Sequence, residues 1–413
     1  MIRPRILGVI LAGGKGERLY PLTKERSKPA VPFGSKYRII DFVLSNFINS
    51  GIYSLYILVQ YKSQSLIDHI RRGWRSSALV DEHFVITVPP QMRWGESWYR
   101  GTADAVFQNM NLIRDVNPDL VGIFGADHIY RMDLRQMVDA HLERQADVSV
   151  AALPVPIETA SGFGILETAE DGRIIGWEEK PAHPRAMPGD PAKALSSMGN
   201  YIFSTEVLED ALAEDARRST DHDFGRTIIP ELYPYARVFA YDFLSNEIPG
   251  LHPGEERGYW RDVGTIEAYW RANMNLLGEA PALDLDNPHW PILAAPFAGP
   301  AARVIAGRVE DASLGEGSII RDGTVRHSIL GQGVMVEPGA VIEDSIILDN
   351  TVVGRKARIR RAIVDRFNVI EPETAIGWDK DRDLAAGIIL DSSGIPVLPR
   401  GTTRVRGSIP ALR

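Results

Sequence analysis

The most constraining feature of the sequence is an apolar residue that recurs every six positions near the C-terminus. The residues spaced in this way form three series: Leu330, Val336, Ile342 and Leu348; Ile347, Val353 and Ile359; and Val364, Ile370 and Ile376. Glycines such as Gly323 and Gly339 punctuate the same stretch. A six-residue apolar period with glycines at the corners is typical of a parallel β-helix, in which each side of a rung is one short strand and one turn.

A single rung cannot bury its apolar side chain alone, so the rungs have to stack. The competing interpretation, a β-sandwich of short strands, requires apolar residues at period two rather than six. We therefore predict a β-helix domain over residues 303–413. Five prolines fall within residues 281–302, which precede it, and this composition is typical of a linker or an extended arm.

Residues 1–280 instead alternate short apolar runs with amphipathic stretches. The runs predict strands at 6–11, 55–59, 120–124 and 148–153. The stretches predict a helix capped by Asp41 and stopped by Gly51, one helix through Val106, Met110 and Ile113, and one at 134–145. This alternation indicates an α/β fold with a mixed, mainly parallel sheet and flanking helices. In such a sheet, ligands bind at the carboxyl ends of the strands.

Composition excludes several classes of function. The chain has 413 residues, enough for two domains, and it has no cysteine, which excludes disulfides, thiolate nucleophiles and Cys-based zinc sites. Its net charge of −8 argues against a nucleic-acid partner. No segment has the roughly twenty apolar residues that a membrane span needs, and the apolar run at 6–12 is too short for a secretion signal. We expect a cytoplasmic protein without a membrane partner.

A glycine loop follows the first predicted strand directly, in the run Leu11–Leu19. Its spacing fits neither the G-x-x-x-x-G-K-[ST] phosphate loop nor the G-x-G-x-x-G dinucleotide motif. A bare Gly-Gly-x-Gly is most simply a tight turn between strand and helix. Here Lys15 and Arg18 lie on the loop and Lys28 follows shortly after it, so we interpret the loop as a phosphate site in which backbone N–H groups approach the ligand.

The run Leu11–Leu19 with Lys28-Pro29-Ala30-Val31-Pro32 resembles the signature of sugar nucleotidyltransferases. Further segments are similar to the glucose-1-phosphate adenylyltransferase family in particular: Trp98–Ala105, Gly125–Tyr130, Trp177–Pro181, Ser197–Gly199 and Tyr259–Thr265. The resemblance covers nearly the whole chain. It implies transfer of AMP from ATP to glucose 1-phosphate for glycogen synthesis, on a Rossmann-like catalytic domain followed by a left-handed parallel β-helix for assembly and regulation.

The resemblance also implies a magnesium site. Asp127 ends an apolar strand, and from that position alone a metal ligand and a helix N-cap are equally good interpretations. In the family the matching aspartate holds Mg²⁺, and Asp262 matches the second metal-binding carboxylate. The alternative for Asp262 is an ion pair with Arg261.

The same resemblance implies contacts to both substrates. The residues expected to bind ATP are Leu11, Ala12, Gly13, Gly14, Lys15, Gly16, Gln60, Gly101 and Thr102, with Arg18 and Lys28 holding the triphosphate. Those expected to bind glucose 1-phosphate are Tyr99, Gly164, Glu179, Lys180 and Ser197. As a bare tetrapeptide, Glu178-Glu179-Lys180-Pro181 is more simply a solvated turn, and Tyr99 could be packed in the core.

Two alternatives remain from the sequence alone. A thymidylyl- or uridylyltransferase would share the fold and the metal site, and a non-catalytic regulatory subunit would share both domains. The family is commonly tetrameric and activated by anionic effectors, so we expect a homotetramer with such effectors. Glu25 stands where well-studied members have an effector-binding lysine, which puts activation by fructose 1,6-bisphosphate in doubt. Arg358, Arg360 and Arg361 are candidates for an opposite wall of that site.

Overall fold

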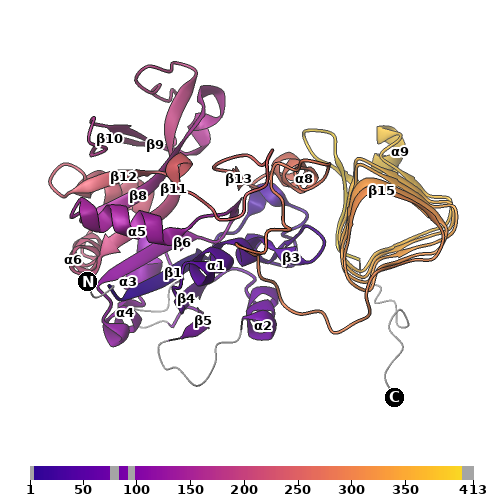
Figure 1. Ribbon diagram of the computed structural model, residues 1–413, viewed down its shortest axis with the longest axis horizontal. Coiled ribbons are helices and arrows are strands. Elements are labelled where there is room, and N and C mark those ends of the chain that lie inside the picture. Colours follow the sequence, from indigo (N-terminus) through magenta and orange to yellow (C-terminus); the bar gives the residue numbers. More distant parts are fainter. Residues whose placement is uncertain (1–3, 75–82, 92–97, 402–413) are drawn as a thin grey trace.

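The computed structural model describes residues 4–74, 83–91 and 98–401, so the last twelve positions of the predicted β-helix domain lie outside it. The chain forms an α/β body and a triangular stack of short strands beside it (Figure 1). None of the helices that the structure describes has the length and apolar character that a membrane crossing requires.

The α/β body is built on one mixed sheet of nine strands. Seven of them follow the order β10 (Ile174–Glu179), β9 (Gly164–Thr168), β11 (Lys193–Ser204), β6 (Leu120–Gly125), β1 (Ile6–Ala12), β4 (Ser54–Val59) and β5 (Phe84–Val88). The other two are β8 (Val148–Pro156), which pairs with β11, and β12 (Val238–Asp242), which pairs with β8. β1 pairs in parallel with both β4 and β6, whereas β11 pairs antiparallel with β6, β8 and β9.

Helices cover both faces of this sheet because successive side chains of its strands point to opposite faces. On β1, Ile10 and Ala12 pack in one cluster with α1 (Ile39–Asn49), α2 (Gln64–Gly73) and α5 (Leu134–Glu143). Leu7 and Val9 pack in the other, with α3 (Thr102–Phe107), α4 (Met110–Val116), α6 (Thr205–Ala216) and α7 (Ile229–Leu232). The result is a three-layer core.

Two details of the predicted helices differ from the structure. The stripe through Val106, Met110 and Ile113 is not one helix, because the chain breaks at Gln108–Asn109 into α3 and α4. The N-cap residue of α1 is Arg38 and not Asp41. Asp41 lies within the first turn, where its Oδ2 accepts a hydrogen bond of 2.8 Å from the Arg38 N–H and so closes a capping box.

The C-terminal stack is a parallel β-helix, and this confirms the predicted fold class. One side consists of β14 (Arg303–Val304), β16 (Ile319–Ile320), β18 (Met335–Val336), β21 (Val352–Val353) and β24 (Val369–Ile370). The other two sides belong to a sheet of β15 (Gly307–Leu314), β17 (Gly323–Leu330), β19 (Val341–Glu343), β20 (Ile346–Ile347), β22 (Arg358–Arg360), β23 (Ile363–Val364), β25 (Ala375–Ile376), β26 (Ile389–Leu390) and β27 (Pro396–Leu398). The short helix α9 (Lys380–Ala385) follows β25.

The apolar period inside the β-helix is not a uniform six. Equivalent positions on successive rungs lie 16 or 17 residues apart, as Ile319, Met335, Val352 and Val369 show. The interior series therefore passes from Ile342 to Ile347 in five steps. Leu348, which the six-residue series placed inside, belongs instead to the cluster between the two domains.

That inter-domain cluster joins Phe33, Phe42 and Tyr269 of the α/β body to Ile329 and Ile346 of the β-helix. Tyr269 lies on α8 (Ile266–Met274), the helix that faces the β-helix in Figure 1.

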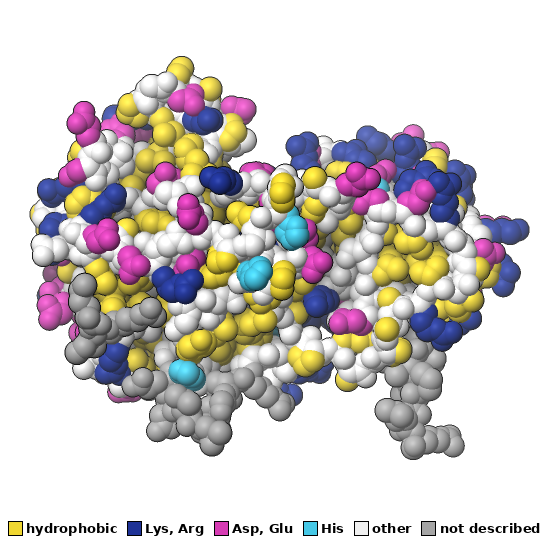
Figure 2. Space-filling model, viewed as in Figure 1, with side chains coloured by type: hydrophobic (Ala, Val, Ile, Leu, Met, Phe, Trp, Pro, Cys, Tyr) yellow, Lys and Arg dark blue, Asp and Glu magenta, His cyan; other side chains and the backbone are white. Residues whose placement is uncertain are grey.

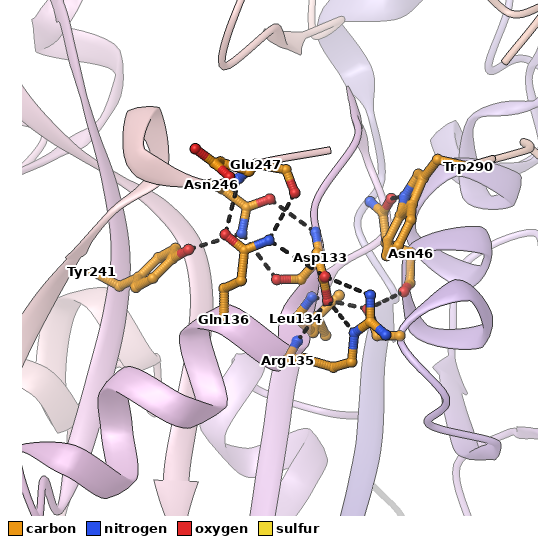
Figure 3. Close-up of polar contacts among 10 residues, drawn as sticks. Asn46, Asp133, Leu134, Arg135, Gln136, Tyr241, Asn246, Glu247 and Trp290 are labelled. Atoms are coloured by element: carbon orange, nitrogen blue, oxygen red, sulfur yellow. Dashed lines mark hydrogen bonds and ion pairs between the residues drawn. The ribbon is translucent and has the colours of Figure 1, made fainter. Parts of the chain in front are cut away.

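Residues 281–302 contain no described helix or strand before β14 begins. They form an extended arm on α1, where Asn49 Nδ2 donates a 3.0 Å hydrogen bond to the Pro291 carbonyl. Figure 3 shows Trp290 of this arm reaching Asn46, close to a polar network around Asp133 that also holds the loop at Asn246. The arm is thus fixed to the body by buried contacts.

Candidate functional site

The predicted site residues meet in a cleft of about 910 Å³ at the carboxyl ends of β1, β4 and β6. All of them line this cleft except Ala12, which is 1% exposed and packs in the core. A second, smaller cavity of about 620 Å³ lies at the amino ends of β1, β4 and β5, around Ile6, Ser54 and Phe84, and none of the predicted site residues line it.

The two predicted metal ligands are brought together by a short antiparallel ribbon. It consists of β7 (His128–Tyr130) and β13 (Trp260–Asp262), and it pairs His128 with Asp262. Asp127 precedes β7 and caps no helix, so the N-cap alternative for it is excluded. One ligand atom each from Asp127, His128 and Asp262 can lie within 4.8 Å of one another.

Lys28 completes this cluster from a third segment. Its Nζ lies 3.1 Å from Asp127 Oδ2 and 2.7 Å from Asp262 Oδ1. Burial alone would lower the pKa of Lys28, but the two carboxylates raise it. Burial alone would likewise raise the pKa of Asp127, but the Lys28 ammonium and then His128 hold it well below its usual range. The pairing therefore keeps the Lys28 ammonium and the Asp127 carboxylate charged.

The donor set fits a divalent metal. The Asp127 and Asp262 carboxylates offer the hard oxygen ligands that Mg²⁺ prefers, one directly before β7 and one at the end of β13. The alternative partner of Asp262, Arg261, instead bonds Glu256, with Nη2 and Oε2 2.5 Å apart. His128 adds a ring whose Nδ1 is buried without a hydrogen-bond partner among the described residues.

The glycine loop lies beside this cluster. Gly16 has φ 63°, and a Cβ there would approach Lys28 Cβ to 3.0 Å, so a larger residue would be strained and would press on the lysine. Gly14 faces open space, which leaves its backbone accessible from the cleft. Arg18 is exposed and its Nη2 lies 3.8 Å from Asp262 Oδ2. Lys15 pairs loosely with Glu17, at 3.8 Å between Nζ and Oε1.

Gln60 and Thr102 mainly hold the walls of the cleft. Gln60 Oε1 accepts a 3.0 Å hydrogen bond from the Tyr99 N–H. Thr102 Oγ1 donates to Asp223 Oδ2 at 2.9 Å. Position 101 requires glycine, because a Cβ there would lie 2.2 Å from the His222 carbonyl oxygen and clash with it. Tyr99 lines the cleft with its ring, while its hydroxyl accepts a 2.9 Å hydrogen bond from Asn109 Nδ2.

Glu179 and Lys180 lie at the end of β10. Glu179 Oε1 lies 3.0 Å from Lys180 Nζ, and the Lys180 side chain is half exposed, so an incoming anion can reach its ammonium. Gly164 is needed for a reason that the sequence did not reveal. A Cβ on it would lie 2.7 Å from Glu179 Oε2, so the glycine makes room for Glu179 rather than directly for a ligand.

Ser197 lies where the pairing of β11 with β8 shifts register, between Ser197 and Tyr201. A bulge of this kind re-aims side chains at a site. Sequence reasoning missed Asp223 and His128, which also line the cleft. Asp223 sits in Asp223-Phe224-Gly225, and its side chain also caps the helical turn that follows. The sequence signal that could have pointed to Asp223 is its place as an acidic cap residue at the start of a helical turn.

Comparison with known proteins places these features in a family. Residues 7–279 match the family model described as nucleotidyl transferase, and residues 300–398 match the GlmU-like C-terminal hexapeptide model. A glucose-1-phosphate adenylyltransferase of Thermodesulfovibrio yellowstonii is 52% identical over 96% of both chains. The proteins of that name from an Anaeromyxobacter species and from Thermus thermophilus are 49% and 48% identical, over 96% and 97% of this chain and 98% and 99% of theirs.

Proposed function

The chain belongs to the glucose-1-phosphate adenylyltransferase family, and from that premise we propose how its cleft carries out the reaction. The protein is a nucleotidyltransferase that transfers AMP from ATP to glucose 1-phosphate, which gives ADP-glucose and pyrophosphate for glycogen synthesis. A cytoplasmic location is consistent with glycogen synthesis, and we also propose it.

The phosphate oxygen of glucose 1-phosphate attacks the α-phosphorus of ATP in line. The new P–O bond forms as the bond to the β-phosphate oxygen breaks and pyrophosphate leaves. The protein has to bring two polyanions together and stabilise the charge that builds on the phosphates. We propose that Lys180 orients the attacking phosphate and that Arg18 and Lys28 hold the triphosphate. The observation that carries this assignment is the convergence of Lys28, Asp127 and Asp262 at one end of the cleft.

Nucleotidyltransferases of this kind use a divalent metal, and we propose that Asp127 and Asp262 hold Mg²⁺. Held by these two carboxylates, the metal would supply positive charge that stabilises the leaving pyrophosphate. Glu179 and Ser197 line the same cleft and are proposed to bind the sugar and its phosphate, together with Tyr99 and Gly164. The loop from Leu11 to Gly16 with Gln60, Gly101 and Thr102 is proposed to enclose the nucleotide.

Pyrophosphate release with each nucleoside triphosphate in turn tests this proposal. With glucose 1-phosphate as the second substrate, ATP is expected to give the highest kcat/KM. A preference for dTTP or UTP would favour the thymidylyl- or uridylyltransferase alternative. Failure of every triphosphate would favour the non-catalytic subunit.

We further propose that the β-helix mediates assembly into a homotetramer. On one side of it, Ile320, Val336 and Val353 point inward, so their preceding neighbours point outward. Those neighbours, Ile319, Met335 and Val352, continue to Val369, which is 40% exposed, and together they form an apolar row suited to an interface. Sedimentation of a chain truncated after Leu277 is expected to show dissociated or poorly soluble protein. An intact tetramer would contradict this role.

Regulation by anionic effectors is also a proposal, placed near the junction of the domains. Arg26 is buried there and Arg366 is partly buried, and carboxylates already pair with both. Arg26 Nη2 lies 2.5 Å from Asp365 Oδ2, and Arg366 Nε lies 3.1 Å from Asp349 Oδ2. An anionic effector that reaches these arginines therefore has to compete with Asp365 and Asp349.

A further inference from the structure

The ammonium group of Lys28 occupies the space between the two carboxylates proposed to hold the metal. It lies within hydrogen-bond distance of one oxygen of Asp127 and one oxygen of Asp262, and its side chain is only 7% exposed. Such charge-assisted hydrogen bonds are stronger than ordinary ones. Lys28 thus uses the same carboxylates that a divalent cation would need.

The charges around the two carboxylates disfavour binding of a divalent metal ion while the Lys28 ammonium is in place. Asp127 and Asp262 carry two negative charges, and Lys28 with the nearby Arg18 carries two positive ones. This group of four side chains is therefore neutral as it stands. A free divalent cation would meet no net attraction from it and would be repelled by an ammonium a few ångströms away.

The cleft also offers Lys28 a second partner. The glycine loop lies beside its stem, because a Cβ on Gly16 would approach Lys28 Cβ to 3.0 Å. A lysine ammonium binds as a point charge, and phosphate is a ligand that lysine commonly takes. The triphosphate of a nucleotide in the cleft would bring the negative charge that both cations require.

We propose that Lys28 competes with the divalent metal for Asp127 and Asp262, so that the metal binds tightly only together with the nucleotide, whose phosphates take over the ammonium. This inference rests on the proposed metal site and adds an order of events to it. Lys28 acts here as an electrostatic gate on metal binding, in addition to its proposed contact with the triphosphate.

Titration of the full-length protein with Mn²⁺ in the absence of nucleotide tests the gate, with free Mn²⁺ followed by electron paramagnetic resonance. Wild type is expected to bind Mn²⁺ weakly alone and much more tightly with ATP. Lys28→Met, which removes the charge and keeps the length, is expected to bind Mn²⁺ alone at least about tenfold more tightly than wild type, within the usual range of coupling between sites. Lys193→Met removes one exposed positive charge, paired with Asp190, and is expected to leave Mn²⁺ affinity unchanged.

Two outcomes separate the gate from the metal site. If wild type alone binds Mn²⁺ as tightly as wild type with ATP, the gate is wrong even should Lys28→Met fail to fold, because this comparison needs only wild type. If Lys28→Met gains no affinity over wild type, the gate is also wrong. The Lys28→Met/Asp127→Asn double variant is expected to lose the gained affinity. If it keeps that affinity, Mn²⁺ binds elsewhere and the proposed metal site itself fails.

Discussion

The β-helix and the catalytic cleft are held together over very different distances along the chain. The strands of the β-helix from β14 to β25 pair with strands 16 or 17 residues away, so one repeated pattern specifies most of the domain. Only the final strands, β26 and β27, depart from this spacing among the described residues. The cleft instead joins Lys28, Asp127 and Asp262, which come from three remote segments. A periodic domain can therefore be recognised from spacing alone, whereas an active site of this kind cannot.

Their charged groups differ in the same way. On the β-helix surface, Arg326 bridges Glu310 and Glu343 at 3.2 and 3.1 Å, and about half of the Arg326 side chain is exposed. Figure 2 shows Lys and Arg side chains gathered along the outer edge of this domain. Exposed pairs of this type contribute little to stability. In the cleft, by contrast, buried or half-buried charges of opposite sign converge on one point, where they can act on phosphates.

The largest difference between the regions is expected from matched aspartate substitutions. Asp127→Asn should lower kcat by about 10³-fold or more, since loss of one metal-coordinating charge costs several kcal/mol at the transition state. Asp344→Asn, at an exposed β-helix carboxylate that bonds His327 Nδ1 at 2.8 Å, should leave kcat nearly unchanged. Steady-state rates with thermal unfolding curves provide the comparison. A near-normal kcat in Asp127→Asn would show that the metal assignment is wrong.

The next effect concerns the ion pair that joins the two regions. Arg26 and Asp365 are 2% and 1% exposed, so Arg26→Met leaves a buried carboxylate without its partner. We expect the free energy of unfolding to fall by about 3–5 kcal/mol, as for other broken buried pairs. Arg326→Met, which removes an exposed β-helix arginine, should cost less than about 1 kcal/mol.

Denaturant unfolding measures both substitutions. The double variant Arg26→Met/Asp365→Leu removes both charges and should recover much of the loss, because no buried charge is left alone. Equal costs for Arg26→Met and Arg326→Met would mean that the domain junction is no more sensitive to charge than the open surface.

Within the cleft, we expect one substitution to change KM for one substrate and not for the other. Lys180→Ala should raise KM for glucose 1-phosphate by about 10- to 100-fold, equivalent to the roughly 1.5–3 kcal/mol of a hydrogen bond to a charged group, and leave KM for ATP almost unchanged. Lys193→Ala, at an exposed lysine paired with Asp190, serves as the control and should change neither. A similar rise in both KM values would assign Lys180 a general structural role instead.

Whether a feature could be predicted from the sequence alone depends on how far apart along the chain its residues lie. The β-helix and the α/β alternation were predictable because period and burial are local properties. The place of Leu348 was not, because it depends on the catalytic domain packing against that side. Asp127 stood at a strand end, yet only the ribbon of β7 and β13 brings it to Asp262. The sequence assigned Gly164 to the site as a contact to glucose 1-phosphate. Its contact with Glu179 could not be predicted, because no spacing rule relates the two residues.

The smallest expected effect lies at Glu25, between the two regions. Glu25 is exposed, and its neighbour Arg26 is already bound to Asp365. The arginines expected to form an opposite wall have other partners as well, since Arg358 and Arg360 stack on Trp378 and Arg361 on Trp270. A negative charge beside a bound phosphate is repulsive, so we expect weak or no activation by fructose 1,6-bisphosphate.

Activation titrations of wild type and Glu25→Lys side by side check this expectation. Glu25→Lys replaces a repulsive charge with an attractive one and should gain a modest sensitivity to fructose 1,6-bisphosphate. A monophosphate or smaller anion, which needs fewer free cations, should be the better activator of wild type, if one acts. Strong activation of wild type by fructose 1,6-bisphosphate would refute the prediction. No change in Glu25→Lys would mean that Glu25 is a solvated surface residue and that the effector site lies elsewhere.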